Sequence, residues 1–353
     1  MRRVYIDNVK GNEILARSIY DDKGRVLLAK GMKLRLNYIS KLKEMGIISL
    51  YIEDKFSQEI VEDEFIYHHI RAQSERQFHK IVEMMKETQT LDMEAVNNLV
   101  TDVMDQIIDE KEILIHAADI LRYDTYTYAH SINVCMMSII MSKFFGYSMS
   151  RIKEIAIGAL LHDLGKIFIP ESILNKKDPL TEEEFQKIKL HPQDGYHVLR
   201  NYPELSGISK VIVLAHHERL DGSGYPSGLK GDQIHDGIRL VSICDVFDAM
   251  TSDRPYRKGI KTYEVIEYLM NMGGQIFDAS MIQKFIRKIA IYPVGQGVIL
   301  NTGEKGIVIQ QNYNMPSRPV VRVFWNAKGE RVVPYEIDML KKTTVFIMKE
   351  VTI

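Results

Sequence analysis

An apolar helical stretch that ends in a histidine and an aspartate constrains this chain most. In residues 160–166 two leucines precede His162 and Asp163, and Lys166 follows after a glycine. Consecutive side chains on an α-helix point about 100° apart, so both groups reach one point only if the helix ends there or if metal ions lie between them. A bridging carboxylate satisfies the second condition. Taken alone, a His-Asp pair is more often a surface feature than a ligand pair.

A second cluster, residues 216–226, follows the apolar run 211–214. The adjacent His216 and His217 place two nitrogen ligands at the end of an element, and the glycine-rich loop after them lets the backbone approach a ligand closely. A tight surface turn explains the glycines and the proline equally well. Structural histidines rarely occur as adjacent pairs, so the cluster favours a binding role.

Three isolated residues complete a candidate site. Taken singly, His130 is explained as a satisfied core histidine, His191 as a helix-end residue and Asp245 as a cap or a buried ion pair. Together with the two clusters they supply imidazoles and carboxylates without thiolates, which are the ligand types of Mn, Fe or Zn hydrolytic centres. The predicted metal ligands are His130, His162, Asp163, His191, His216, His217 and Asp245.

The hydrophobic pattern changes along the 353 residues from alternating to helical and back. Short apolar runs separated by turn residues predict strands at both ends, and steps of three and four residues predict helices between them. The C-terminal part has hairpin turns at 301–303 and 328–329. We predict a mainly α fold with small β-rich ends: an N-terminal domain at 1–57 with a helix near 34–45, a helical connector at 58–115, a helical catalytic domain at 116–290 and a C-terminal β domain at 291–353.

The predicted connector carries an apolar stripe from Val96 to Ile108 at helical spacing. The stripe packs against its own domain or forms the seam of a homodimer through the helical region 74–112. Sustained heptads are absent, which favours packing within the domain.

Composition excludes several function classes. The formal net charge is −1, from 46 basic and 47 acidic residues, so no global field attracts polymeric nucleic acid or an anionic membrane. Cys135 and Cys244 are too far apart in sequence for a paired motif, which argues against a disulfide framework or a thiolate zinc site. Acidic and amide residues interrupt the first residues where a signal peptide needs an apolar core, so we expect a cytoplasmic protein.

The longest uncharged run, residues 125–142, approaches the length of a membrane span. It contains His130, Ser131 and Asn133, which are costly in lipid. We interpret the run as a buried core helix, in which Met136, Met137 and Met141 are flexible core filling rather than ligands of a soft metal.

The ordered motifs resemble the HD-GYP family, a branch of the HD phosphohydrolase superfamily associated with breakdown of cyclic di-GMP. The resemblance covers about half of the chain and runs through residues 124–131, 162–166, 191–192, 216–226 and 245–257. A single His-Asp element is a weak signal, whereas five motifs in this order are a strong one. The resemblance implies an HD-type helical bundle in the middle of the chain.

The resemblance also implies roles for individual residues. Asp163 corresponds to the carboxylate that bridges two metals, and Lys166 to a lysine that contacts phosphate; we predict both as catalytic. Tyr225 resembles a tyrosine near the substrate, and Arg254 and Arg257 resemble cations that contact the nucleotide. An ordinary solvated basic patch would look similar to this arginine pair, but its place just downstream of Asp245 favours the phosphate role.

The implied cofactor is a pair of divalent ions, with iron or manganese expected and zinc, nickel or magnesium also compatible. Some family members hold a third metal with a glutamate one helical turn before the first histidine, where this chain has Tyr126. Two ions about 3.5–4 Å apart would share a water, lower its pKa and direct the hydroxide at phosphorus. The expected reaction is hydrolysis of cyclic di-GMP to pGpG, GMP or both.

Two other functions remain open at this point. The chain is also compatible with a receptor that binds cyclic di-GMP without turnover, and with an HD phosphohydrolase that acts on another nucleotide. The complete set of predicted metal ligands argues against a receptor without turnover. The loop at 224–226 and the segment 254–257 argue against a different nucleotide as the substrate.

Overall fold

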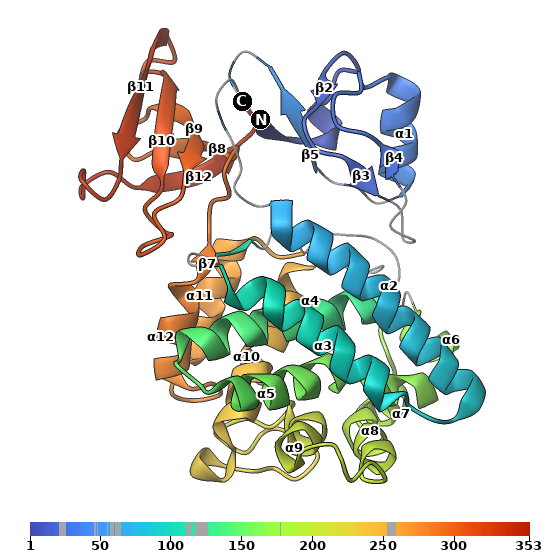
Figure 1. Ribbon diagram of the computed structural model, residues 1–353. Helices are drawn as coiled ribbons and strands as arrows, with labels where there is room; N and C mark the ends of the chain where they lie inside the picture. Colours follow the sequence, from blue (N-terminus) through green and yellow to red (C-terminus); the bar gives the residue numbers. More distant parts are fainter. Residues whose placement is uncertain are drawn as a thin grey trace. The chain divides into compact units, whose positions relative to one another are not determined.

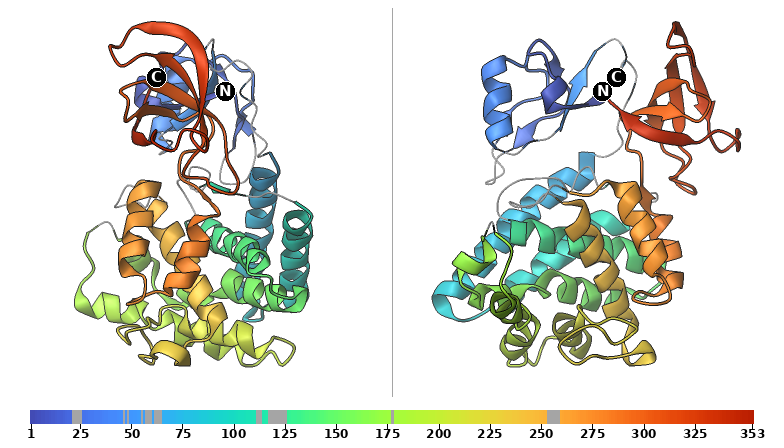
Figure 2. Two further views of the ribbon diagram at one scale, coloured as in Figure 1. Left: turned by 90° about the vertical axis from the view of Figure 1, so that its left-hand side faces the viewer. Right: turned by 180° about the vertical axis from the view of Figure 1, so that it is seen from behind.

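The chain forms two compact units, one rich in β-structure and one helical. The computed structural model describes residues 1–20, 26–45, 47, 49–54, 56, 60, 65–110, 114–116, 126–176, 178–252 and 259–353. The β-rich unit comprises 1–65, 114–124 and 287–353, and the helical unit comprises 66–113 and 125–286. All strands of the described residues belong to the β-rich unit (Figures 1 and 2). The predicted mainly α fold with small β-rich ends is confirmed, and the division into four domains stays a prediction.

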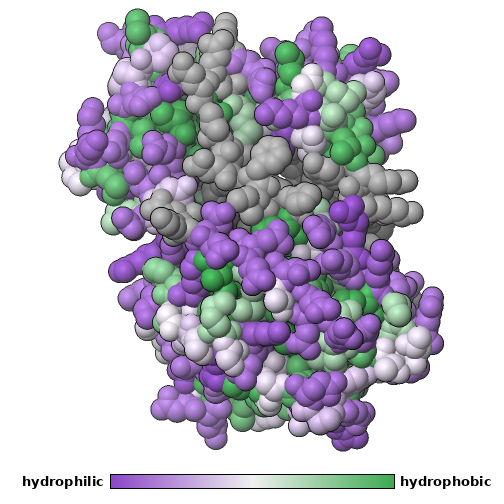
Figure 3. All heavy atoms as spheres, in the orientation of Figure 1, coloured by the Kyte–Doolittle hydropathy of each residue, from purple (hydrophilic) through white to green (hydrophobic). Residues whose placement is uncertain are grey.

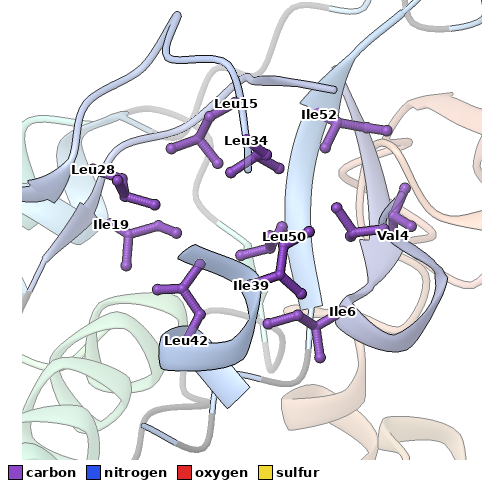
Figure 4. Packing of buried hydrophobic residues seen from close by; sticks show 11 residues of the cluster. Val4, Ile6, Leu15, Ile19, Leu28, Leu34, Ile39, Leu42, Leu50 and Ile52 are labelled. Atoms are coloured by element: carbon purple, nitrogen blue, oxygen red, sulfur yellow. The ribbon is translucent and has the colours of Figure 1, made fainter. Parts of the chain in front are cut away.

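The N-terminal part of the β-rich unit is a small sheet with one helix. Its elements are β1 (Arg2–Tyr5), η1 (Ile6–Asn8), β2 (Ile14–Leu15), β3 (Ile19–Tyr20), β4 (Val26–Leu28), α1 (Leu36–Glu44) and β5 (Ser49–Glu53). Strands pair in the order β1-β5-β2, and β3 pairs with β4. Leu15, Leu34 and Leu42 point into one core beneath the sheet (Figure 4). The helix predicted near 34–45 is therefore confirmed as α1.

The C-terminal part is a five-stranded antiparallel sheet in the order β11-β10-β9-β8-β12. Its strands are β8 (Gly297–Leu300), β9 (Lys305–Gln310), β10 (Val320–Trp325), β11 (Arg331–Asp338) and β12 (Ile347–Val351). Gly303 and Gly329 adopt positive φ angles of +86° and +79° in the hairpins, as the predicted turns require. Short strands β6 (Ile115–His116) and β7 (Ile289–Ala290) pair in parallel.

The helical unit packs its helices around α4 and α5. Its elements are α2 (Phe65–Thr88), α3 (Met93–Ile108), α4 (Tyr126–Phe144), α5 (Met149–Leu161), η3 (Leu164–Phe168), α6 (Glu171–Leu174), α7 (Glu182–Ile188), α8 (His191–Leu199), α9 (Gly207–Ala215), η4 (Gly231–Gln233), α10 (Asp236–Thr251), α11 (Thr262–Met272) and α12 (Ala279–Ile286). Helix α5 packs against α4 and α9, and α10 packs against α4.

Helix α4 is the predicted core helix, and its methionines confirm that interpretation. Met136, Met137 and Met141 are each 0% exposed. The apolar stripe of α3 packs on α4 and α5, with Val96 and Val100 fully buried, so it is covered within its own unit. A homodimer is not needed to bury this stripe and stays a prediction.

Hydrophilic residues spread over the visible face of the helical unit, with apolar residues between them in small groups (Figure 3). Within the described ranges, none of the helices combines the length and the apolar character that a membrane crossing requires. The two cysteines, Cys135 and Cys244, are buried and free.

Candidate metal centre

Two pairs of predicted ligands lie where a helix ends. Helix α5 ends at Leu161, His162 is its cap, and Asp163 has already left the helix with φ −97° and ψ 7°. Helix α9 ends in the same way, with His216 as its cap. Adjacent side chains at such an end no longer diverge as they do inside a helix. The helix therefore ends at His162 and Asp163, which is one of the two ways in which both side chains can reach one point.

A close approach of η3 and α8 brings His191 to Asp163. A Cβ atom on Gly165 would overlap the carbonyl oxygen of His191 and would lie 2.7 Å from the amide nitrogen of Gly195. Only glycine at position 165 leaves room for this contact. As a result, His191 Nε2 lies 3.2 Å from Asp163 Oδ1.

Helices α4 and α10 supply the remaining pair. His130 Nε2 lies 3.1 Å from Asp245 Oδ1 and 3.2 Å from His162 Nε2. On the other side of the cluster, His217 Nδ1 lies 3.8 Å from Asp245 Oδ2. Because α10 packs directly on α4, residues 115 positions apart in sequence meet in one buried site.

All seven predicted ligands converge. Ligand atoms within each of three overlapping groups lie within 4.8 Å of one another: His130, His162 and Asp245; His162, Asp163 and His216; and His191, His216 and His217. Six of the seven residues are buried, and the His217 side chain is 19% exposed. The site therefore opens to solvent on the side of His217.

The helix ends also orient the imidazoles. The Nδ1 groups of His162, His191 and His216 each donate a hydrogen bond to the carbonyl oxygen three residues earlier, over 2.7, 2.7 and 3.0 Å. The last carbonyls of a helix are free to accept such bonds. A neutral imidazole that donates from Nδ1 presents a lone pair at Nε2.

These lone pairs face each other. His191 Nε2 and His216 Nε2 are 3.3 Å apart, with no proton available between two acceptors. Asp163 Oδ1 is buried and has no hydrogen-bond partner among the described residues. A bound cation would satisfy all three atoms at once. The residues present therefore fit a divalent-metal site.

Electrostatics hold His216, His217 and Asp163 in the protonation states that ligands need. Burial, reinforced by the neighbouring histidines, holds the pKa of His216 well below its usual value, and burial lowers the pKa of His217 to about 3. Burial alone would raise the pKa of Asp163, but Lys166 and His162 hold it well below the usual value. Neutral imidazoles and an ionised carboxylate are the forms that bind metals.

His130 differs from these histidines because it lies inside helix α4. The backbone carbonyls around it are used within the helix, so none is free to accept a hydrogen bond from its ring. Its Nδ1 instead donates to Asp248 Oδ2 over 2.6 Å, and Asn133 Nδ2 donates to the other oxygen of that carboxylate over 2.8 Å. Although burial lowers the pKa of His130, Asp245 and Asp248 raise it to about 9. Asp248 was not among the predicted site residues; it lies three residues from Asp245 on the same helix, a spacing that by itself does not separate a site residue from a buried ion pair.

A second missed residue, Glu218, anchors the loop beside the site. Glu218 is 2% exposed, and its carboxylate accepts hydrogen bonds from the backbone amides of Ser227 and Leu229 over 2.7 and 3.0 Å. This loop carries Tyr225, whose ring packs on the His217 imidazole with centroids 4.7 Å apart. In the sequence, the position of Glu218 directly after His216 and His217 was the signal for this residue.

The predicted substrate contacts are only partly described. Lys166 Nζ lies 2.6 Å from Asp163 Oδ2, and its side chain is 22% exposed. Tyr225 lies beside His217, and burial raises its pKa. Arg254 and Arg257 lie outside the described residues.

Two parts of the chain match models of known domain families. Residues 138–281 match the model of an HD domain, and residues 297–353 match a KOW domain associated with HD domains. The chain is 35% identical over 249 residues to a cyclic di-GMP phosphodiesterase of Pseudomonas aeruginosa, covering 70% of this chain and 60% of that protein. It is 32% identical over 234 residues to a 3′3′-cGAMP-specific phosphodiesterase of Vibrio cholerae, covering 63% of this chain and 50% of that protein.

The chain thus spans between half and three-fifths of the length of these two relatives. Among solved structures, Bd1817, an HDG"Y"P protein from Bdellovibrio bacteriovorus, aligns with a TM-score of 0.49 at 18% identity, over 80% of this chain and 97% of that one.

Proposed function

We propose that the chain belongs to the HD-GYP family of HD-domain proteins and that its helical unit is a metal-dependent phosphodiesterase, which hydrolyses cyclic di-GMP to pGpG, GMP or both. The observation that carries the proposal is the convergence of seven imidazole and carboxylate side chains whose lone pairs face one another in a buried site. Such an arrangement is unfavourable without bound cations.

We place two divalent ions in this site and expect them to be iron or manganese. One ion would be held by His130, His162 and Asp245, and the other by His191, His216 and His217. The two oxygens of Asp163 face different histidines, since Oδ1 lies 3.2 Å from His191 Nε2 and Oδ2 lies 3.4 Å from His162 Nε2. This carboxylate is therefore the group suited to bridge the ions.

Divalent ions bound in such a site lower the pKa of water and polarise a phosphate oxygen. The protein's own groups add charge and position. Lys166 is paired with Asp163 on the partly exposed side of the cluster, so its ammonium lies close enough to help neutralise charge that develops on the phosphate oxygens of a bound substrate. Tyr225 forms a wall of the opening beside His217, and Glu218 holds the loop that carries it. We propose Arg254 and Arg257 as further phosphate contacts.

The choice of cyclic dinucleotide needs a direct test, because relatives of comparable identity are named for two substrates, cyclic di-GMP and 3′3′-cGAMP. The protein is purified without oxygen, its metal content is measured, and both compounds are followed by chromatography. The matched variants are Asp163→Ala and Asp178→Ala, the second at an exposed aspartate outside the site.

We expect cyclic di-GMP to be cleaved by the wild type and by Asp178→Ala, and Asp163→Ala to lose metal and activity together. Preferential cleavage of 3′3′-cGAMP would replace the proposed substrate. Tight binding of cyclic di-GMP by a fully metallated protein without product would identify a receptor instead. Hydrolysis that survives in Asp163→Ala would refute the role of this carboxylate.

A further inference from the structure

A lysine lies between two aromatic rings on the open side of the metal centre. Lys189 Nζ is 5.4 Å from the centroid of the Tyr225 ring and 4.8 Å from the centroid of the Phe185 ring. The Tyr225 ring in turn packs on His217 at a tilt of 31°. These four side chains form a continuous row from the ligand cluster to the surface, where Phe185 is 42% exposed.

The other described cations beside the cluster are already engaged. Lys166 is paired with Asp163 at 2.6 Å, and Arg219 donates to the carbonyl oxygen of His216 and to Ser242. Within the described part of the chain, the Lys189 ammonium has ring faces as neighbours and no carboxylate at ion-pair distance. Ring faces hold a cation in place but leave its N–H groups free to donate to a ligand.

A cyclic dinucleotide brings two phosphodiester groups to the site. When one group is at the metal centre, the other remains charged and needs a partner outside the ligand cluster. Building on the proposed function, we propose that Lys189, held between Phe185 and Tyr225, binds the second phosphate of the cyclic dinucleotide. This interaction depends on the second phosphate and not on the bases, so we expect it to be the same for cyclic di-GMP and 3′3′-cGAMP.

A pair of substrates separates this role from a role at the metal centre. Cyclic di-GMP has a second phosphate, whereas bis(4-nitrophenyl) phosphate has only the one that reacts. The variants are Lys189→Gln, Lys189→Arg and, as a matched control, Lys187→Gln, because Lys187 is exposed in the last turn of the helix that Lys189 caps. Steady-state kinetics on both substrates, metal content and the Kd for a phosphorothioate analogue of cyclic di-GMP are measured for each.

For Lys189→Gln we expect KM and Kd for the dinucleotide to rise about tenfold, which corresponds to about 1.4 kcal/mol. Its kcat, its metal content and its activity on bis(4-nitrophenyl) phosphate stay within about twofold of wild type, since an interaction that is equally strong in the ground and transition states affects KM alone. Lys189→Arg keeps the charge and restores most of the affinity, and Lys187→Gln behaves as wild type.

Three results would overturn the proposal: an unchanged KM and Kd, an equal loss on both substrates, or the same loss in Lys187→Gln. If the wild type cleaves neither cyclic di-GMP nor bis(4-nitrophenyl) phosphate, the proposed phosphodiesterase function is rejected. The Kd for the phosphorothioate analogue still decides the role of Lys189. In that case equal affinity of wild type and Lys189→Gln, or no binding by either, rejects the binding of a second phosphate by Lys189.

Discussion

Asp248 offers a perturbation that separates orientation of a ligand from ligation itself. The residue is 0% exposed on α10, and its Oδ2 accepts a 2.6 Å hydrogen bond from His130 Nδ1. Asp248→Asn keeps the size of the side chain and an acceptor oxygen but removes its charge. His130 keeps its place in the core while the bond that fixes its ring loses charge assistance.

The expected size of the effect follows from this single bond. A hydrogen bond to a charged group contributes about 1.5–3 kcal/mol and a neutral one about 0.5–1.5 kcal/mol, so the substitution costs the His130 ring about 1–1.5 kcal/mol. At about 1.4 kcal/mol per factor of ten, metal affinity should fall about 5- to 10-fold. Complete removal of a group that orients a metal-bound histidine typically costs more, about 10- to 100-fold.

The assay is a competition titration of manganese or zinc against a chromophoric chelator, together with a thermal melt of the metal-free protein. The matched control is Asp236→Asn, an exposed aspartate in the first turn of the same helix. Metal affinity within about twofold of wild type would refute the orienting role. A melting temperature that falls while affinity is kept would assign Asp248 to folding alone.

Three other predictions follow from particular contacts. Gly165→Ala should lose metal and lower the melting temperature, because its Cβ meets the His191 carbonyl; a fully metallated, stable variant contradicts this close approach. Glu218→Gln should weaken the two hydrogen bonds from the backbone amides of residues 227 and 229, and so raise KM about tenfold at constant metal content. Hydrogen exchange at 227–229 should increase, and unchanged exchange would contradict this role of Glu218. Leu99→Ala, at a side chain 3% exposed, should cost about 2–5 kcal/mol of unfolding free energy without changing the oligomeric state measured by light scattering. A change of oligomeric state with little loss of stability would instead favour the dimer seam.

Much of the site was predictable because its residues interrupt apolar runs. His162 and His216 directly follow buried helical segments, so their pattern predicts side chains at helix ends within the core. The hairpins at Gly303 and Gly329 were predictable for a similar reason, since local turn chemistry decides them.

Features that depend on distant contacts were not predictable from one sequence. Asp248 lies 118 residues from His130, and nothing in its neighbours separates it from a buried ion pair. The two β-rich ends form one compact unit through contacts such as the 2.9 Å hydrogen bond from the Arg3 amide to the Gly295 carbonyl, which no local pattern reveals. Burial of the α3 stripe within its own unit depends in the same way on where α4 and α5 lie.

We propose that seven side chains form a dinuclear metal centre that carries the hydrolysis. The most direct test is stepwise reconstitution of chelator-treated protein with manganese or iron, in which bound metal per chain, measured by mass spectrometry, is compared with the rate of cyclic di-GMP cleavage. We predict no activity without metal and a full rate only as two ions are bound per chain. Full activity in metal-free protein, or saturation at one ion per chain, would contradict it.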